Sequence, residues 1–199
     1  MAQVDLWLDD DDIAAANAAG KFTFTVPDDA VKRGNLDDPN DDKAKAMWVQ
    51  SLEIVEAKMY EDEARDKDGN TYPAICAEVK FQVPPDALRS TGEPDPNAGK
   101  NHMAWYRIVK AAIKNKQHPK YKANNFNLGR LNSILRSVWG SDVIPHGTRV
   151  NFADFFHASD GQLPAVVGKT VVANVKASKY EGERKDELMD FVPLELQGS

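Results

Sequence analysis

The sequence has few of the residues that disulfides, metal sites and membrane spans require. Cys76 is the only cysteine among 199 residues, which excludes an intrachain disulfide and any cysteine-based zinc site. The four histidines lie in separate segments, and no stretch of 18 apolar residues is present. The N-terminus, MAQVDLWLDDDD, has acids where a signal peptide would have bases. We therefore expect a cytoplasmic protein that binds no metal or other cofactor and enters no membrane.

Motifs of catalysis are also missing. Phosphate-loop, dinucleotide-binding and nucleophile-elbow signatures are absent. The carboxylate pairs Glu61/Glu63 and Glu183/Asp186 lie in turns rich in other charges, where solvation explains them better than acid–base chemistry. We expect no catalytic residues and no enzyme.

Charge is distributed unevenly along the chain. The formal net charge is −6, and residues 1–46 alone carry eleven acids against five bases. Residues 100–149 carry ten bases against one acid, a local net charge of +9. This asymmetry indicates a site for a polyanion beside an acidic segment that can compete for it. Two unrelated solvated surfaces are the alternative interpretation.

The first 46 residues differ in composition from the rest, and we expect a domain boundary there. Asp9–Asp12 can cap a short helix through Asn17, and Lys21–Val26 alternates like a short strand. Pro, Gly and acids then indicate an extended linker. We interpret residues 1–46 as an acidic N-terminal arm that docks locally or on a partner, and residues 47–199 as the folded domain.

Hydrophobic periodicity predicts five strands and one long helix in that domain. The first strand, 48–60, changes parity midway, which predicts a bulge. An Asp68-Gly69 turn leads into a second strand at 72–83, and a third follows at 102–109. Leucines at helical spacing predict a helix over 127–139, with Arg130 and Arg136 on its exposed side. A last hairpin spans 164–193.

This order of elements predicts the fold class. Five short strands with a helix between the third and the fourth are the layout of the OB-fold, a partly open barrel that binds oligonucleotides and oligosaccharides. We expect a mainly β protein with a five-stranded OB-fold-like barrel, preceded by the acidic arm.

Basic and aromatic side chains on the predicted strands and turns suit single-stranded nucleic acid, which requires a basic groove and aromatic faces for stacking. Trp105 and Tyr106 must point to opposite faces of their strand, and we favour Trp105 and Arg107 on the outer face. The predicted nucleic-acid-binding residues are Tyr72, Lys80, Trp105, Arg107, Lys110, Lys114, Lys116, Lys169, Lys176, Lys179 and Tyr180.

The last third of the chain carries a more specific pattern. The segment V-G-K-T-V-V-A-N-V-K at 167–176, then Tyr180-Glu181-Gly182 and the ending M-D-F-V-P at 189–193, resembles a family of small bacteriophage OB-fold proteins of the domain-of-unknown-function type. The resemblance implies single-stranded DNA binding in phage replication and recombination, in the host cytoplasm. The residues that match the family's pattern are Gly168 and Lys169, which enter the fourth strand, and Lys176, Tyr180 and Gly182, at the hairpin.

Two other functions remain open at this point. A virion structural or assembly protein would use the N-terminal arm to pack on neighbouring subunits. An adaptor would use the same barrel to bind a polymerase or nuclease. The leading hypothesis is a non-catalytic single-stranded DNA-binding protein, and it allows a homo-oligomer. Its acidic arm would weaken non-specific DNA binding, recruit replication or recombination proteins, or only keep the protein in solution.

Overall fold

The fold is described by a computed structural model over residues 4–19, 47–88, 92–141, 143–145, 147–159, 161–176, 179–180, 183–184 and 186–197. For 16–19, 47, 179–180 and 183–184 only the backbone is described. Residues 20–46, with the predicted strand at 21–26 and the linker, lie outside this part. No helix in the described residues has the length and apolar character needed to cross a membrane.

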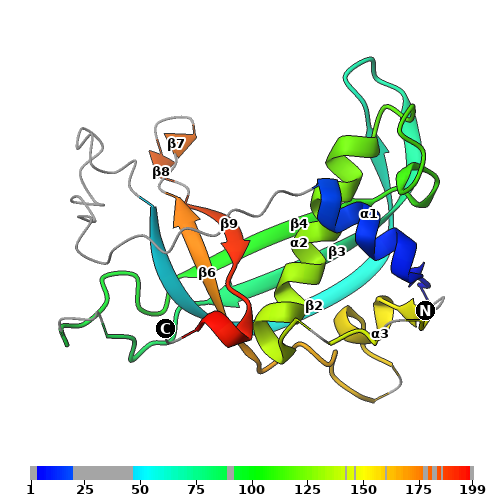
Figure 1. Ribbon diagram of the computed structural model, residues 1–199. Helices are drawn as coiled ribbons and strands as arrows, with labels where there is room; N and C mark the ends of the chain where they lie inside the picture. Colours follow the sequence, from blue (N-terminus) through cyan, green and yellow to red (C-terminus); the bar gives the residue numbers. More distant parts are fainter. Residues whose placement is uncertain are drawn as a thin grey trace.

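A five-stranded antiparallel sheet forms the centre of the molecule (Figure 1). Its order is β4-β3-β2-β6-β9. The strands are β2 (Met47–Arg65), β3 (Thr71–Gln82), β4 (Asn101–Ile108), β6 (Thr170–Lys176) and β9 (Glu187–Phe191). A helix, α2 (Tyr121–Trp139), stands between β4 and β6 in the chain. The predicted succession of three strands, a helix and two strands is confirmed.

Strand β2 is shared by both halves of the sheet. Up to Glu53 it pairs with β6, and from Glu53 onward it pairs with β3. The register shifts between Ile54 and Glu56, which confirms the predicted bulge. Because the bulge adds one residue, the buried positions pass from Leu52 and Ile54 to Ala57 and Met59.

The turn between β2 and β3 is built around Asp66. Its carboxylate accepts hydrogen bonds from the backbone N–H groups of Asp68 and Asn70 and from the Tyr72 hydroxyl. The Asn70 side chain also donates to this carboxylate, and the hydrogen bonds together, that of the Asn70 side chain first, lower the pKa of Asp66 to about 2. Gly69 has a φ of 86°, a conformation that favours glycine. The predicted Asp68-Gly69 hairpin turn is confirmed.

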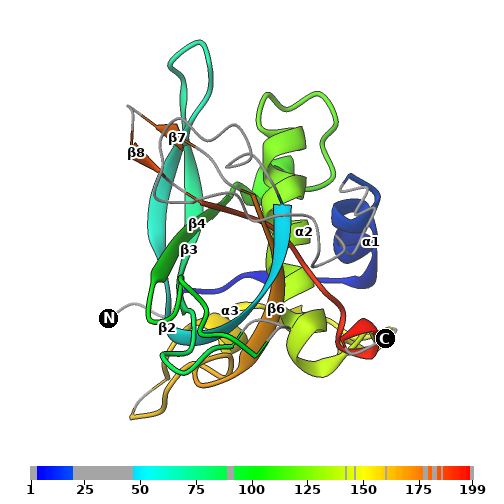
Figure 2. The same ribbon diagram turned by 90° about the vertical axis from the view of Figure 1, so that its left-hand side faces the viewer.

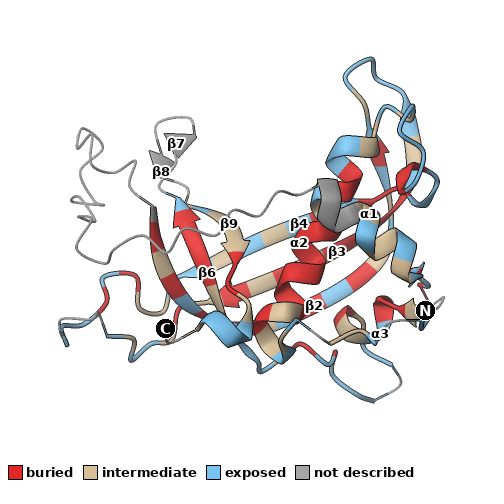
Figure 3. Cartoon of the chain, viewed as in Figure 1, coloured by how far each residue is buried: buried red, intermediate tan, exposed pale blue. Residues whose placement is uncertain are grey.

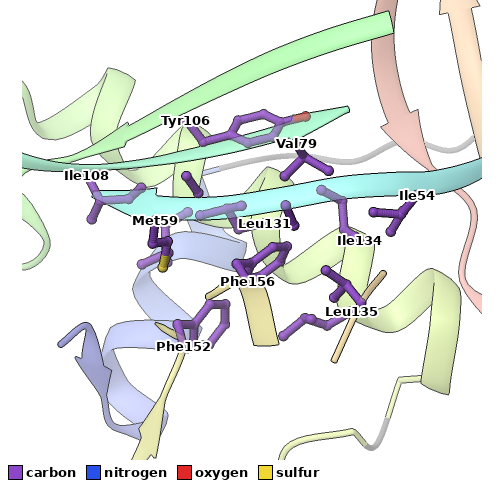
Figure 4. Close-up of a cluster of buried hydrophobic side chains, with 14 of the residues drawn as sticks. Ile54, Met59, Val79, Tyr106, Ile108, Leu131, Ile134, Leu135, Phe152 and Phe156 are labelled. Carbon is purple, nitrogen blue, oxygen red and sulfur yellow. The ribbon is translucent and has the colours of Figure 1, made fainter. Parts of the chain in front are cut away.

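Helix α2 covers one face of the sheet, and the core lies between them (Figures 2 and 3). Leu131, Ile134 and Leu135 of α2 pack towards Val79 and Tyr106 of the sheet (Figure 4). Phe152 and Phe156, at the short helix α3 (Ala153–Phe156), complete this cluster. Strand alternation over 72–83 predicts that Ile75, Ala77, Val79, Phe81 and Val83 point inward, and all five are buried.

Helix α2 begins six residues earlier than the pattern predicted. Tyr121 to Phe126 has no apolar stripe, so hydrophobic spacing detected only the part that packs on the sheet. The prediction that Arg130 lies on the exposed side is wrong, because its residue is only 5% exposed. Its guanidinium donates to the Leu188 carbonyl at 2.9 Å and approaches the Asp190 carboxylate at 3.7 Å. The helical pattern could not predict these contacts with β9, because β9 lies far from Arg130 along the chain.

The described part of the predicted arm packs on the domain. Strand β1 (Trp7–Leu8) pairs with β5 (Val150–Asn151), and Leu6 and Leu8 lie in the core. Asn151 fixes this contact, since its Oδ1 accepts the Leu6 N–H at 2.9 Å. For residues 4–15 the structure therefore shows local docking.

Helix α1 (Asp10–Ala19) follows β1 and confirms the predicted helix after the aspartate run. Asp9 and Asp12 cap it reciprocally: the Asp12 N–H donates to Asp9 Oδ1 at 2.8 Å, and the Asp9 N–H donates to Asp12 Oδ2 at 3.1 Å. The helix lies against α2, as Figure 2 shows.

The closing hairpin is present as β6 and β9, with a two-residue ribbon, β7 (Lys179–Tyr180) and β8 (Glu183–Arg184), between them. The sheet ends at β4 on one side and β9 on the other, and it is not closed into a barrel. Side chains of α2 hold both edges: Asn127 donates to the Arg107 carbonyl in β4, and Arg130 to the Leu188 carbonyl in β9. The mainly β class is confirmed, and the OB-fold barrel stays a prediction.

Candidate nucleic-acid interface

The outer face of β2, β3 and β4 carries the exposed aromatic residue of the sheet. Trp105 is 49% exposed, whereas its neighbour Tyr106 is 7% exposed and belongs to the core. Strand alternation sends the two rings to opposite faces. The preference for Trp105 and Arg107 on the outer face agrees with this arrangement.

Glu78 organises this outer face. Its carboxylate accepts hydrogen bonds from the Trp105 indole N–H at 3.1 Å and the Tyr60 hydroxyl at 3.2 Å, and it pairs with the Lys58 ammonium at 2.8 Å. The Lys58 ammonium, first among these partners, lowers the pKa of Glu78. The indole is thereby held in one orientation with half of its surface open to solvent.

Arg107 lies beside Trp105 on the same face. Its Nε donates to Asp62 Oδ2 at 2.6 Å, and this contact raises the pKa of Arg107. The pKa of Asp62 is lowered, mainly by the Glu63 backbone N–H and then by Arg107. Because both side chains keep solvent contact, the pair is worth little for stability and leaves guanidinium N–H groups for another partner.

A cleft of about 400 Å³ opens next to Trp105. It lies between the ends of β2 and β4 and the first turn of α2, and its lining includes the bases Arg65, Arg107 and Lys120 and the acid Glu63. The Lys120 ammonium donates to the Arg65 carbonyl, and the Asn124 side chain accepts the Val109 N–H. Cationic and amide donors thus surround a space adjoining an exposed aromatic ring.

A second cleft, of about 660 Å³, lies near the β2–β3 turn. Its walls include Glu61, Asp62 and Glu63, together with Tyr72 and His118, whose rings are 4.7 Å apart. Against these three carboxylates the lining holds one lysine, Lys110, so the net negative charge makes this space unfavourable for a phosphate. The cleft beside Trp105 is therefore the better candidate for an anionic ligand.

The predicted site residues are distributed over several elements. Lys80, Trp105 and Arg107 share the outer face, while Tyr72 is tied to Asp66 in the turn. Lys110 and Lys116 are exposed in the segment between β4 and α2. Lys169 and Lys176 are exposed at opposite ends of β6. The side chains of Lys179 and Tyr180 lie outside the described residues.

Lys114 already has partners within the chain. Its ammonium lies 3.0 Å from Asp9 Oδ1 and 3.2 Å from Asp12 Oδ1. These are the same carboxylates that cap α1. The acidic segment at the start of α1 therefore already forms ion pairs with one of the predicted binding residues.

Strand alternation at 72–83 predicts that Glu78 points outward, and the structure confirms it, but sequence reasoning missed Lys58 and Tyr60 as members of the outer face. The signal was available in part, because the parity change in β2 turns its even-numbered residues outward after the bulge. Placing the bulge at residue 55 would have put Lys58 and Tyr60 beside Glu78. Arg65 and Asn124 had no such signal, since the cleft forms only when the β2 end meets α2.

Among the described residues, no group of three or more His, Cys, Asp and Glu side chains comes together as a potential metal site. Comparison with protein-family models finds no family that matches the chain, and comparison with curated proteins finds no relative.

Proposed function

We propose that the chain is a non-catalytic single-stranded DNA-binding protein of the bacteriophage OB-fold type, acting in replication or recombination. The observation that carries the proposal is the half-exposed Trp105, held by Glu78 beside Arg107 and a basic cleft. A stacked base on such a ring is worth about 1–3 kcal/mol, and cations beside it attract the phosphates.

The sheet supports an OB-like architecture. An OB-fold is a five-stranded barrel that is only partly closed. The order β4-β3-β2-β6-β9 makes β4 and β9 the edges that closure would join, and these two strands contact each other. Helix α2 is hydrogen-bonded to both edges, to β4 through the Asn127 side chain and to β9 through the Arg130 side chain.

The segment that carries the family resemblance also fits its expected role. Gly168 has a φ of 77° in the turn before β6, and Lys169 is exposed next to it. Lys176 is exposed at the other end of the strand. An exposed lysine thus lies at each end of β6, the fourth strand of the domain, and the turn at Gly168 presents the first of them.

A virion assembly protein is the second candidate. An arm that cannot form a core by itself favours this candidate. Leu6 and Leu8, however, pack in the core of their own chain, so this part of the arm is not available to a neighbouring subunit. Residues 20–46 are the remaining part of that arm. Deleting residues 20–46 separates the two functions: loss of assembly favours a structural protein, whereas unchanged or tighter DNA binding favours the first proposal.

The direct test is titration of an oligo-dT of about 16 nucleotides, followed by tryptophan fluorescence at low and high salt. We expect quenching at low salt and an affinity that falls steeply between about 50 and about 200 mM salt, because phosphate binding releases counterions. No binding at low salt, or binding that ignores salt, would contradict the proposal. Duplex DNA and RNA of equal length serve as the comparison ligands.

A further inference from the structure

The first turn of α2 lacks the groups that normally satisfy a helix N-terminus. No side chain caps it, and its first turn contains no acid but has Lys120 and Lys122. The first α-helical hydrogen bond is donated by Asn124 to the Lys120 carbonyl. The N–H groups of Lys122 and Ala123 therefore have no partner one turn back. With the helix dipole, they favour an anion at this end.

Asn124 gives an independent indication at the same place. It lines the cleft beside Trp105 and is only 2% exposed. Its Oδ1 accepts the Val109 N–H, while its Nδ2 has no partner in the structure. A buried amide donor without an acceptor is costly, and an anion in the cleft would supply an acceptor once the side chain turns Nδ2 toward it.

The cationic side chains of the cleft are ordered around the same space. Lys120 donates to the Arg65 carbonyl and Arg107 is held by Asp62, so both have defined positions before any ligand arrives. Against Arg65, Arg107 and Lys120 the lining holds the single acid Glu63. Pre-ordered donors lose less conformational entropy when they bind.

Trp105 lines this cleft as well as the outer face. A nucleotide whose base stacks on the indole therefore has its phosphate next to the first turn of α2. The geometry points to a phosphate seat in this cleft, in which Lys120, Arg65, the Asn124 amide and the first-turn N–H groups of α2 bind one backbone phosphate of a strand stacked on Trp105. This inference rests on the proposed function for the identity of its ligand, a phosphodiester, which shares its chemistry with free phosphate.

The matched substitution is Asn124→Asp. It keeps an oxygen to accept the Val109 N–H but replaces the unpartnered donor with a negative charge. The helix dipole favours an acid near this end of α2, whereas burial of the carboxylate opposes it, so the thermal midpoint of the variant is measured first to establish that it folds. Gln162→Glu, an exposed residue in the loop before β6, is the control for added negative charge.

Two ligands are then titrated into the full chain. With inorganic phosphate, followed by amide NMR, we expect saturable shifts at the Lys122 and Ala123 backbone amides and at the Asn124 side-chain amide of the wild type. In Asn124→Asp the shifts of the Lys122 and Ala123 amides should vanish. With oligo-dT, we expect Asn124→Asp to weaken binding about tenfold and Gln162→Glu to leave it unchanged, because one charge-assisted donor is replaced by repulsion. Lys120→Gln gives a second measure that does not depend on Asn124: the slope of log affinity against log salt should fall by about 1.

The outcomes separate the two proposals. Oligo-dT binding that is equally strong in wild type and Asn124→Asp, with an unchanged salt slope in Lys120→Gln, overturns the phosphate seat and leaves single-stranded DNA binding intact. Phosphate shifts at α2 without oligo-dT binding support the seat and overturn the proposed function. If neither phosphate nor oligo-dT shifts these amides, the seat is wrong.

Discussion

The two longest helices of the described chain begin in opposite ways. Helix α1 starts with aspartates that cap each other's backbone N–H groups and hold Lys114, so its N-terminus is satisfied within the chain. Helix α2 starts with lysines and no side-chain cap. Natural helices usually place acids at this end. The start of α1 is thus satisfied within the chain, whereas the start of α2 is the place at which we propose that a phosphate binds.

The largest expected effect concerns how firmly each helix is held. Leu131 of α2 is fully buried, while Ile13 of α1 is only partly buried against the same core. Leu131→Ala should lower the free energy of unfolding by about 2–5 kcal/mol. Ile13→Ala should cost about 1 kcal/mol, because less apolar area is lost. Urea unfolding of both variants checks this, and equal losses would show that α1 is as central as α2.

The next effect concerns two of the exposed tryptophans, Trp105 beside the start of α2 and Trp7 beside α1. Trp105→Ala should weaken oligo-dT binding by about 1–3 kcal/mol, since a stacking surface is removed. Trp7 is 44% exposed and lies 5.1 Å from the Arg149 guanidinium, next to α1. Trp7→Ala should leave the affinity unchanged. Fluorescence anisotropy with labelled oligo-dT measures both variants, and an equal loss in both would remove Trp105 from the interface.

A charge reversal at α2 should move stability and binding in opposite directions. Lys122→Glu puts an acid in the first turn, which should stabilise the helix by about 0.3–1 kcal/mol. The same change should weaken oligo-dT binding, because the negative charge repels phosphate. Lys100→Glu, in the exposed loop before β4, is the control for the change in charge. If stability and affinity both fall, the start of α2 is not an anion site.

The smallest effect is a pH response that distinguishes the start of α1 from the start of α2. The Asp12 N–H, followed by Lys114, lowers the pKa of Asp9 below its ordinary value of 3.8. A carboxylate with a lowered folded pKa stabilises the protein above its unfolded pKa, and that contribution is lost as pH falls below 3.8. Amide NMR between neutral and acid pH should show the Asp12 signal changing while the first turn of α2, which has no acid, does not.

Local patterns in the sequence predicted the strands, the bulge in β2, the Asp68-Gly69 turn and the inward face of β3, because each depends on neighbours along the chain. They failed for contacts between distant segments. Arg130 meets a carbonyl 58 residues away, and Leu6 is fixed by Asn151, 145 residues away. The candidate cleft is a product of such contacts, so Trp105 was predictable as an outward ring and Asn124 as a cleft residue was not.

The double pairing of β2 has a mechanical consequence. In the described residues no ladder joins β4 to β9, so the half formed by β3 and β4 is connected to the half formed by β6 and β9 only through β2. Val55 lies at the register shift between the two pairings. We expect any relative rotation of the halves to pivot at the bulge and to stretch the Asn127 and Arg130 hydrogen bonds that tie α2 to either edge. The distance between β4 and β9 would then depend on α2 and on the backbone at Val55.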